Sequence, residues 1–248
     1  MKTLLEISYV GTNFNGFQVQ PNGRTVQETL QDALERLYGM RPAVKGCSRT
    51  DSGVHALQFF ATFESDGRIP CGRLPAALNS VLPPDISVRS AVEVPEDFHV
   101  RHDVLWKEYE YLILNDSIRD PFLVGRAWQI KRPLGENELE RMRAAAEAFP
   151  GKHDFGAFMA AGSDIADTVR DMKWLNIIVD GKLIRIRAAA DGFLYNMVRI
   201  IVGTLVDVGY GRISPEDMPD IISSRNRSRA GFTAPPDGLY LRHVEFSR

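Results

Sequence analysis

The chain has 248 residues, of which 44% are hydrophobic and 25% are charged. A chain of this length can bury a core as one large domain or as two small ones. The 30 Lys and Arg against 32 Asp and Glu leave a net charge of −2, so a nucleic-acid partner would have to meet basic groups gathered on one face. The two cysteines, Cys47 and Cys71, are too few for a disulfide framework or a zinc cluster, and they predict a reducing, cytoplasmic setting.

The apolar runs do not have the form of targeting or membrane segments. The first ten residues carry Glu6 among their apolar residues, unlike a signal peptide. The longest apolar stretch, 193–208, is interrupted by Asn196 and Arg199 and is too short to span a bilayer. We therefore expect no membrane association.

Residues 1–100 are predicted to form a βαββαβ unit. Residues 4–9 have the composition of a strand, and 25–38 form an amphipathic helix in which Thr25 and Glu28 make a capping box. A strand at 44–50, an alternating strand at 55–63, a short helix at 74–81 and a strand at 86–94 follow.

Residues 101–248 are predicted to repeat that order. A strand at 105–114 precedes a helix at 136–148, and Asp180-Gly181 predicts a hairpin between strands 171–179 and 183–190. A buried helix at 193–208 and a last strand at 238–246 complete the repeat. The predicted fold is therefore α+β, with two ferredoxin-like halves, 1–100 and 101–248, side by side and a cleft where they meet.

Asp51 is the first candidate for chemistry, because it lies on a tight turn between two apolar strands, which hold it still while the turn exposes it. A carboxylate with an ordinary pKa of about 3.9 is ionised at pH 7, and a neighbouring arginine, Arg49, favours that form. The ionised form suits a nucleophile or an electrostatic partner better than a general acid. The alternative is that Asp-Ser-Gly is ordinary turn chemistry, with the aspartate bonding its own backbone.

Arg199 lies inside the most apolar predicted helix, where an unpaired guanidinium would be costly. Asn196, Arg199 and Gly203 share one helix face, and Gly203 would let another backbone or a ligand come close. One interpretation places Arg199 in the cleft, facing Asp51. In the other, Arg199 reaches solvent or pairs with Asp207.

Aromatic residues and histidines have both structural and functional interpretations. Tyr109 and Tyr111 share one face of a strand as a core pair, or Tyr109 offers a platform on which a base stacks. His55 has the same parity as Phe59, which favours a hydrogen-bonded core histidine. No histidine group has metal-site spacing, and residues 11–16 open no helix at once, so no metal and no dinucleotide cofactor are expected.

The basic run Arg225-Asn226-Arg227-Ser228-Arg229 is dense enough to propose phosphate contacts. The alternative is a solvated surface, which is the usual role of such runs.

The stretch Gly46-Cys47-Ser48-Arg49-Thr50-Asp51-Ser52-Gly53-Val54-His55-Ala56 resembles the GRTDxGVHA element of the TruA-type tRNA pseudouridine synthases. Ser48, Ser52 and Phe232 depart from the family's commonest residues, and none of these changes removes a reactive group. Further matches follow the family's order along nearly the whole chain: Tyr9-Val10-Gly11-Thr12, Phe14, Gly16-Phe17-Gln18, Gln20, Arg24-Thr25-Val26-Gln27, Phe98, Arg101, Tyr109-Glu110-Tyr111, His153-Asp154-Phe155, Phe193-Leu194-Tyr195-Asn196-Met197-Val198-Arg199, Val202-Gly203, Ala230-Gly231-Phe232-Thr233-Ala234-Pro235-Pro236 and Gly238-Leu239-Tyr240.

The resemblance implies that the halves share an extended, mainly antiparallel sheet with the catalytic cleft between them. It implies isomerisation of uridines 38, 39 and 40 in the tRNA anticodon stem-loop by a cytoplasmic homodimer that needs no cofactor or metal. Asp51 would be the essential aspartate, Arg49 would help to flip the target uridine, Tyr109 would stack on it and help to remove the C5 proton, and Arg199 would form a salt bridge with Asp51. Arg24, Arg225 and Arg227 are further candidate tRNA contacts.

The sequence leaves three roles open for an ionised Asp51, namely attack at C1′, attack at uracil C6, or removal of the C2′ proton. Two other kinds of protein remain as rivals. One is a non-catalytic RNA-binding protein, which has no need of an Asp51–Arg199 pair. The other is a small-molecule hydrolase that uses Asp51 and His55 in a closed, apolar pocket.

Overall fold

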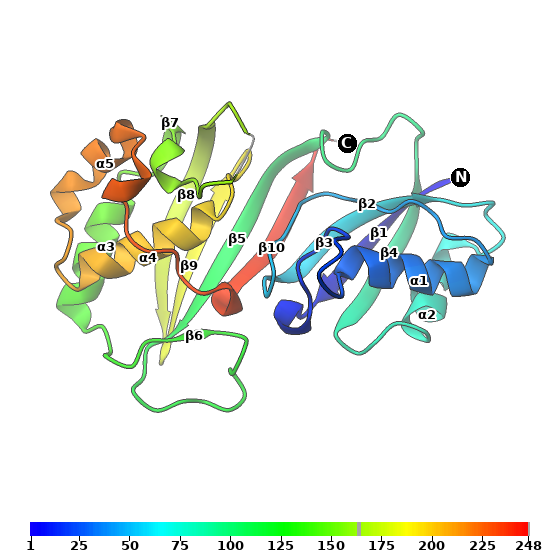
Figure 1. Ribbon diagram of the computed structural model, residues 1–248, viewed down its shortest axis with the longest axis horizontal. Helices are drawn as coiled ribbons and strands as arrows, with labels where there is room; N and C mark the ends of the chain where they lie inside the picture. Colours follow the sequence, from blue (N-terminus) through cyan, green and yellow to red (C-terminus); the bar gives the residue numbers. More distant parts are fainter. Residues whose placement is uncertain (163–164, 248) are drawn as a thin grey trace. The chain divides into compact units, whose positions relative to one another are not determined.

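The computed structural model describes residues 1–162 and 165–247, and the chain divides into two compact units. Unit 1 comprises Met1–Leu105 together with the C-terminal stretch from Tyr240, and unit 2 comprises Trp106–Leu239. In Figure 1, the blue and cyan elements belong to unit 1 and most of the green to orange elements to unit 2.

The sheet of unit 1 has the strand order β4-β1-β3, and two further strands pair with β3. Strand β1 pairs antiparallel with both β3 and β4, and short β2 pairs antiparallel with β3. The pairing of β10 with β3 is parallel. The elements of this unit are β1 (Lys2–Tyr9), η1 (Gly11–Asn13), α1 (Val26–Tyr38), β2 (Lys45–Gly46), β3 (His55–Glu64), η2 (Cys71–Arg73), α2 (Leu74–Asn79), β4 (Ile86–Val94) and β10 (Leu239–Phe246).

Helix α1 forms where the sequence predicts it, because a buried apolar stripe and a cap define it. The Thr25 hydroxyl accepts a hydrogen bond from the Glu28 backbone N–H at 3.3 Å, so Thr25 is the N-cap. Val26, Leu30 and Leu34 are fully buried. Gly39 ends the helix with φ of +69°, a conformation that glycine adopts without a Cβ penalty.

The long strands of unit 2 follow the order β5-β9-β8-β7 in antiparallel pairs, and β6 lies parallel to β5. Every residue of α4 except Arg199 is buried, and α4 packs against α3. The elements are β5 (Val104–Leu114), β6 (Trp128–Gln129), α3 (Glu136–Ala146), β7 (Gly151–Asp154), η3 (Gly156–Phe158), β8 (Val169–Asp180), β9 (Leu183–Ala190), α4 (Met197–Gly209), η4 (Pro215–Asp217), α5 (Met218–Ser224), η5 (Arg227–Arg229) and η6 (Pro236–Gly238).

The α+β class is confirmed, and so is the hairpin between β8 and β9, where Gly181 has φ of +59°. Two predicted elements are wrong in extent. The strand expected at 44–50 is only Lys45–Gly46, because the chain then turns to hydrogen-bond other loops. The helix expected at 193–208 begins at Met197, because Asn196 adopts a left-handed conformation with φ of 59°. Strands β6 and β7 and helix α5 were not predicted.

No helix among the described residues is both long enough and apolar enough to cross a membrane.

Candidate active site

Asp51 occupies a hydrogen-bonded turn that connects β2 to β3. The Val54 N–H donates to the Asp51 carbonyl at 3.1 Å and closes the turn. Gly53 has φ of +80°, and its N–H donates to the Phe14 carbonyl at 3.2 Å. The Asp51 side chain is therefore carried by a backbone whose conformation is set on both sides, and the residue remains partly exposed.

The segment 11–17 packs directly against this turn. A Cβ on Gly11 would lie 2.0 Å from the Val54 carbonyl oxygen, and one on Gly16 would lie 2.6 Å from that of Thr50. The Phe17 N–H donates to the same Thr50 carbonyl at 3.0 Å. Gly11 and Gly16, which the sequence offered as family matches and not as a dinucleotide loop, serve here for close backbone approach.

Two buried polar contacts complete the support of the turn. The Tyr9 hydroxyl and the Thr50 hydroxyl lie 2.7 Å apart. His55 is fully buried, its Nδ1 accepts from the Gly11 N–H at 2.9 Å, and its ring stacks on Tyr240 with centroids 4.5 Å apart. The prediction of a hydrogen-bonded core histidine is confirmed.

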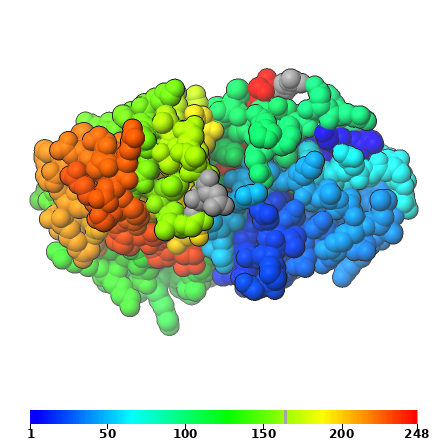
Figure 2. All heavy atoms as spheres, turned by 45° about the horizontal axis from the view of Figure 1, so that its top comes forward, coloured from blue at the N-terminus to red at the C-terminus, as the bar shows by residue number. Residues whose placement is uncertain are grey.

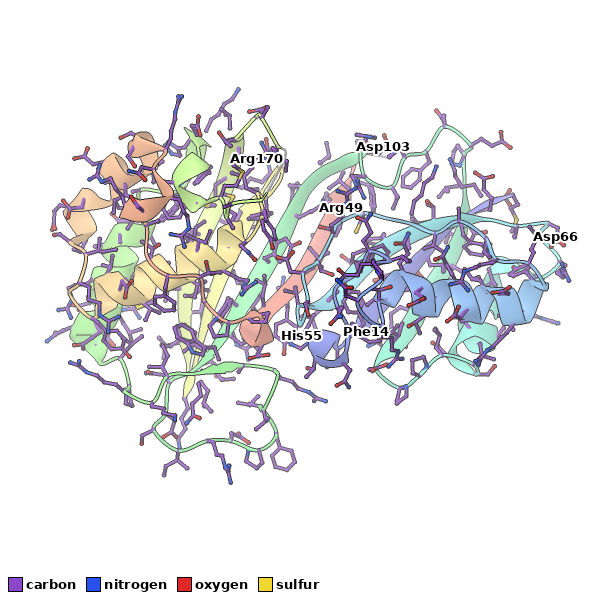
Figure 3. All side chains as sticks on the ribbon, viewed as in Figure 1. Phe14, Arg49, His55, Asp66, Asp103 and Arg170 are labelled. Atoms are coloured by element: carbon purple, nitrogen blue, oxygen red, sulfur yellow. The ribbon has the colours of Figure 1, made fainter. Side chains whose placement is uncertain are left out.

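The two predicted substrate-binding arginines of unit 1 differ in their surroundings. Arg49 is exposed and lies two residues before Asp51. The Arg24 guanidinium lies 4.4 Å from the ring centroid of Phe14 and forms a salt bridge with Asp85 at 3.5 Å. Phe14, His55 and Arg49 are labelled in Figure 3. Arg24 is therefore attached to the loop that supports the turn, and Arg49 extends from the turn itself.

In unit 2, β5 carries the two tyrosines toward one face. Tyr109 is 7% exposed and meets Phe193 edge-to-face, with ring centroids 5.0 Å apart. Tyr111 is fully buried, and its hydroxyl donates to the Pro235 carbonyl at 2.7 Å. Burial raises the pKa of Tyr111 far above its ordinary value, although the nearby Arg199 charge opposes the shift. Tyr111 is therefore a neutral core residue, as the sequence favoured.

Arg199 binds the loop before η6. Its Nε donates to the Ala234 carbonyl at 2.7 Å, and its Nη1 donates to Asn196 Oδ1 at 2.7 Å. The Ala234 N–H in turn donates to the Arg199 carbonyl at 3.0 Å. The alternative pairing with Asp207 is wrong, because Asp207 Oδ1 accepts from Arg212 Nη1 at 2.7 Å.

The loop 230–235 lies close against α4. A Cβ on Gly203 would come within 1.9 Å of the Phe232 carbonyl oxygen, so the expected close approach at Gly203 is made by another backbone. The Gly231 N–H donates to the Thr204 hydroxyl at 2.9 Å. Arg227 Nη1 donates to the Gly231 carbonyl at 2.8 Å, and its Nη2 donates to the Thr233 hydroxyl at 3.2 Å. Arg227 therefore holds this loop.

Arg225 ends α5 with φ of 54° and forms a salt bridge with Asp154 at 2.9 Å, while its side chain stays 70% exposed. Figure 2 shows the orange surface of α5 beside the yellow-green surface of the β7–η3 segment, which these two residues connect. Burial by itself would raise the pKa of Asp154, but hydrogen bonds from Thr168 and Gly156 and the Arg225 charge lower it overall.

The structure thus places Asp51, Arg49 and Arg24 on unit 1, and Tyr109, Arg199, Arg225 and Arg227 on unit 2. Arg49 and Asp51 share one turn, and Arg199 and Arg227 share the loop 230–235. The meeting of Asp51 with Tyr109 and Arg199 stays a prediction. Among the described residues, no group of three or more His, Cys, Asp or Glu side chains could hold a metal ion.

Comparison with known proteins adds an independent line of information. A family model described as tRNA pseudouridine synthase matches residues 7–103 and 145–247. The chain is 46% identical to a protein of Thermoanaerobacter pseudethanolicus over 96% of each chain. It is 44% identical to one of Acetivibrio thermocellus over 98% of each, and 42% identical to one of Ruminiclostridium cellulolyticum over 99% of each. All three relatives are named tRNA pseudouridine synthase A.

Proposed function

Because the chain belongs to the tRNA pseudouridine synthase family, whose members are isomerases, we propose that it converts uridine to pseudouridine at positions 38, 39 and 40 of the tRNA anticodon stem-loop. The observation that carries this proposal is the Asp51 turn, which presents a carboxylate on a backbone clamped by the segment 11–17. A reacting group must be held by a rigid supporting shell, and this turn supplies one.

The proposed reaction rearranges one nucleotide without gaining or losing atoms. The bond between uracil N1 and ribose C1′ breaks, the uracil turns, and its C5 carbon bonds to C1′ while the C5 proton leaves and N1 takes up a proton. An ionised Asp51 acts at C1′, at uracil C6 or on the C2′ proton, and all three routes require its carboxylate. The reaction consumes no nucleotide, hydride or metal-bound water.

The other site residues are proposed to handle the base. A uridine inside a stem has to leave the stack before its C1′ and C5 atoms can react, at a cost of a few kcal/mol. Arg49, exposed beside Asp51, helps to expel it and takes its place in the stem. Tyr109 stacks on the expelled uracil and assists loss of the C5 proton, and Arg199 pairs with Asp51. Arg24, Arg225 and Arg227 are proposed tRNA contacts, the first two with guanidiniums partly exposed.

The setting of Arg199 supports its role in this proposal. Two of its nitrogens are occupied by the Ala234 carbonyl and by Asn196, so the guanidinium is held in a defined orientation. A charged group fixed before substrate binds needs no reorganisation during the reaction. We further propose that the enzyme acts as a cytoplasmic homodimer on tRNA.

His55 argues against the rival hydrolase. Its Nδ1 accepts the Gly11 N–H inside the core, and its ring is fully buried against Tyr240. A general base must reach the proton that it removes, and a histidine held in this way supports the fold of the turn instead.

The proposal is tested by incubating the full chain with unmodified tRNA transcripts and mapping pseudouridine by carbodiimide labelling and primer extension. We expect modification confined to uridines 38–40. Transcripts with cytidine at these three positions are the matched control and should stay unlabelled. Tight tRNA binding without any pseudouridine would instead support the non-catalytic RNA-binding protein, and modification elsewhere in the tRNA would refute the proposed positions.

A further inference from the structure

Two surface segments of unit 1 carry exposed basic side chains near the Asp51 turn. One runs from β2 into the turn and carries Lys45 and Arg49. The other is the turn after β4, where His99, Arg101 and His102 are all exposed. Within the described part of the chain, the side chains of Lys45, Arg49 and Arg101 form no ion pair. These five residues are called the basic patch below.

A series of contacts anchors both segments to the same strands. The Cys47 N–H donates to the Phe60 carbonyl at 2.8 Å, and the Phe60 N–H donates to the Cys47 sulfur at 3.3 Å. The Phe60 ring meets Phe246 with centroids 5.1 Å apart, and Phe246 meets Phe98 at 5.4 Å. Arg49 lies two residues after Cys47 and Arg101 three after Phe98, and both Arg49 and Cys47 act electrostatically on Arg101, so the two arginines lie in one region of the surface.

The turn that carries Arg101 is itself well ordered by hydrogen bonds. The backbone N–H groups of Arg101 and His102 donate to His99 Nδ1 at 3.3 and 3.2 Å. The His99 N–H donates to the Asp103 carboxylate at 2.9 Å, and the Asp103 N–H donates back to the His99 carbonyl at 3.0 Å. The Asp103 carboxylate therefore caps the backbone of this turn. Figure 3 labels Arg49 and, at the end of this turn, Asp103.

The charges of the patch act on one another in the free protein. Burial and the neighbouring charge of Arg49 lower the pKa of Arg101. Burial and the charges of His102 and Lys45 lower the pKa of His99, whereas the Asp103 charge opposes this shift. Groups of like charge held close together repel, and a bound anion relieves that repulsion. Arginine is the side chain best suited to grip a phosphate, because its planar fork donates two parallel hydrogen bonds.

We propose that Arg101, next to Arg49, binds a backbone phosphate of the RNA beside the nucleotide that is turned into the site. The proposal rests on the proposed function, and it assigns Arg101 as a positioning residue that acts on RNA binding and not on bond rearrangement. Because Arg49 lies two residues from Asp51, a phosphate held there fixes the strand next to the reacting sugar.

The test measures binding of an anticodon stem-loop RNA by fluorescence anisotropy over a series of KCl concentrations, with full-length variants. Arg101→Gln should weaken binding about tenfold at low salt and make the slope of log Kd against log salt shallower by about one. Arg101→Lys keeps the charge and should keep the slope. Arg36→Gln removes an exposed charge on α1 and should change neither quantity.

Kinetics on tRNA provide the second measurement. Arg101→Gln should raise KM about tenfold and leave kcat within about twofold, because a phosphate contact is made in the ground state and the transition state alike. An unchanged salt slope in a variant with the unfolding midpoint of the unaltered protein would overturn the proposal. So would a loss of kcat with unchanged binding.

The outcome is separable from that of the proposed function. If the unaltered protein forms no pseudouridine but Arg101→Gln still makes the salt slope shallower, the phosphate site stands and the proposed reaction fails. If pseudouridine forms and the slope is the same for Arg101→Gln and Arg36→Gln, the phosphate site alone fails.

Discussion

The Asp51 turn of unit 1 and Arg199 on helix α4 of unit 2 hold their charged groups in different ways. Asp51 is positioned by the backbone, through the carbonyls and N–H groups that its turn exchanges with the segment 11–17. Arg199 is positioned through its own side chain, which donates to Ala234 and Asn196. The two charged groups are therefore positioned by different means, Asp51 through the main chain of its turn and Arg199 through hydrogen bonds of its own guanidinium.

Substitution of Asp51, which is positioned through the backbone of its turn, should have the greatest effect on turnover. Asp51→Asn should lower kcat at least about a thousandfold, because the amide can neither attack nor remove a proton. Tritium release from C5-labelled tRNA measures turnover, and anisotropy should show that tRNA binding is kept. Substantial remaining turnover would contradict the assignment of Asp51.

Gly203→Ala tests how closely the loop 230–235 packs against α4. The new methyl group would overlap the Phe232 carbonyl, so the loop 230–235 must move, and the free energy of unfolding should fall by about 3 kcal/mol in urea denaturation. Gly72→Ala, which meets no atom within 4 Å, is the control and should stay within about 0.5 kcal/mol of the unaltered protein. Equal stability of the two variants would show that α4 and the loop are not in close contact.

Arg227→Gln separates a loop-holding role from a phosphate-binding one. The hydrogen bonds to Gly231 and Thr233 are lost, so the free energy of unfolding should fall by about 2 kcal/mol. Arg229→Gln, a neighbouring exposed arginine with one backbone contact, is the matched control. Unchanged stability with a shallower salt slope of tRNA binding would assign Arg227 to phosphate instead.

Tyr9→Phe removes the side-chain hydrogen bond that joins Tyr9 of β1 to Thr50 in the Asp51 turn. The Thr50 hydroxyl loses its partner at 2.7 Å, which should lower the free energy of unfolding by about 1 kcal/mol. Because Thr50 directly precedes Asp51, the change in kcat should be larger than the change in KM. Tyr111→Phe removes a bond of the same length to Pro235 in unit 2 and is the comparison variant. If Tyr111→Phe lost more kcat than Tyr9→Phe, the Tyr111–Pro235 hydrogen bond would matter more for turnover than the Tyr9–Thr50 one.

The smallest effect concerns Asp154, whose pKa is lowered in the folded protein. A carboxylate with a lowered folded pKa contributes stability above its unfolded pKa of about 3.9, and this contribution is lost as the pH falls through the folded value. Asp154→Asn should therefore be less stable than the unaltered protein at pH 7, with the difference shrinking below about pH 4. Urea denaturation at several pH values measures it, and a constant difference would contradict this linkage.

Local pattern was sufficient for much of this chain. The stripe and cap of α1, the β8–β9 hairpin and the core role of His55 depend on residues a few positions apart, and all three are confirmed. The end of β2 and the start of α4 were wrong, because contacts of the 47–54 segment and the left-handed Asn196 override the apolar pattern there.

The contiguous motif around Asp51 was enough to identify the family and to single out this carboxylate, because the carboxylate and its turn residues are neighbours in the chain. The residues that support the turn became visible only in the folded chain. The use of Gly11 and Gly16 against the turn, the binding of Arg199 to Ala234 and the hold of Arg227 on its loop each join residues that composition and periodicity do not relate. The physical reason is that the periodic pattern of apolar residues can be seen within one stretch of sequence. A hydrogen bond between two loops depends on where folding brings each of them.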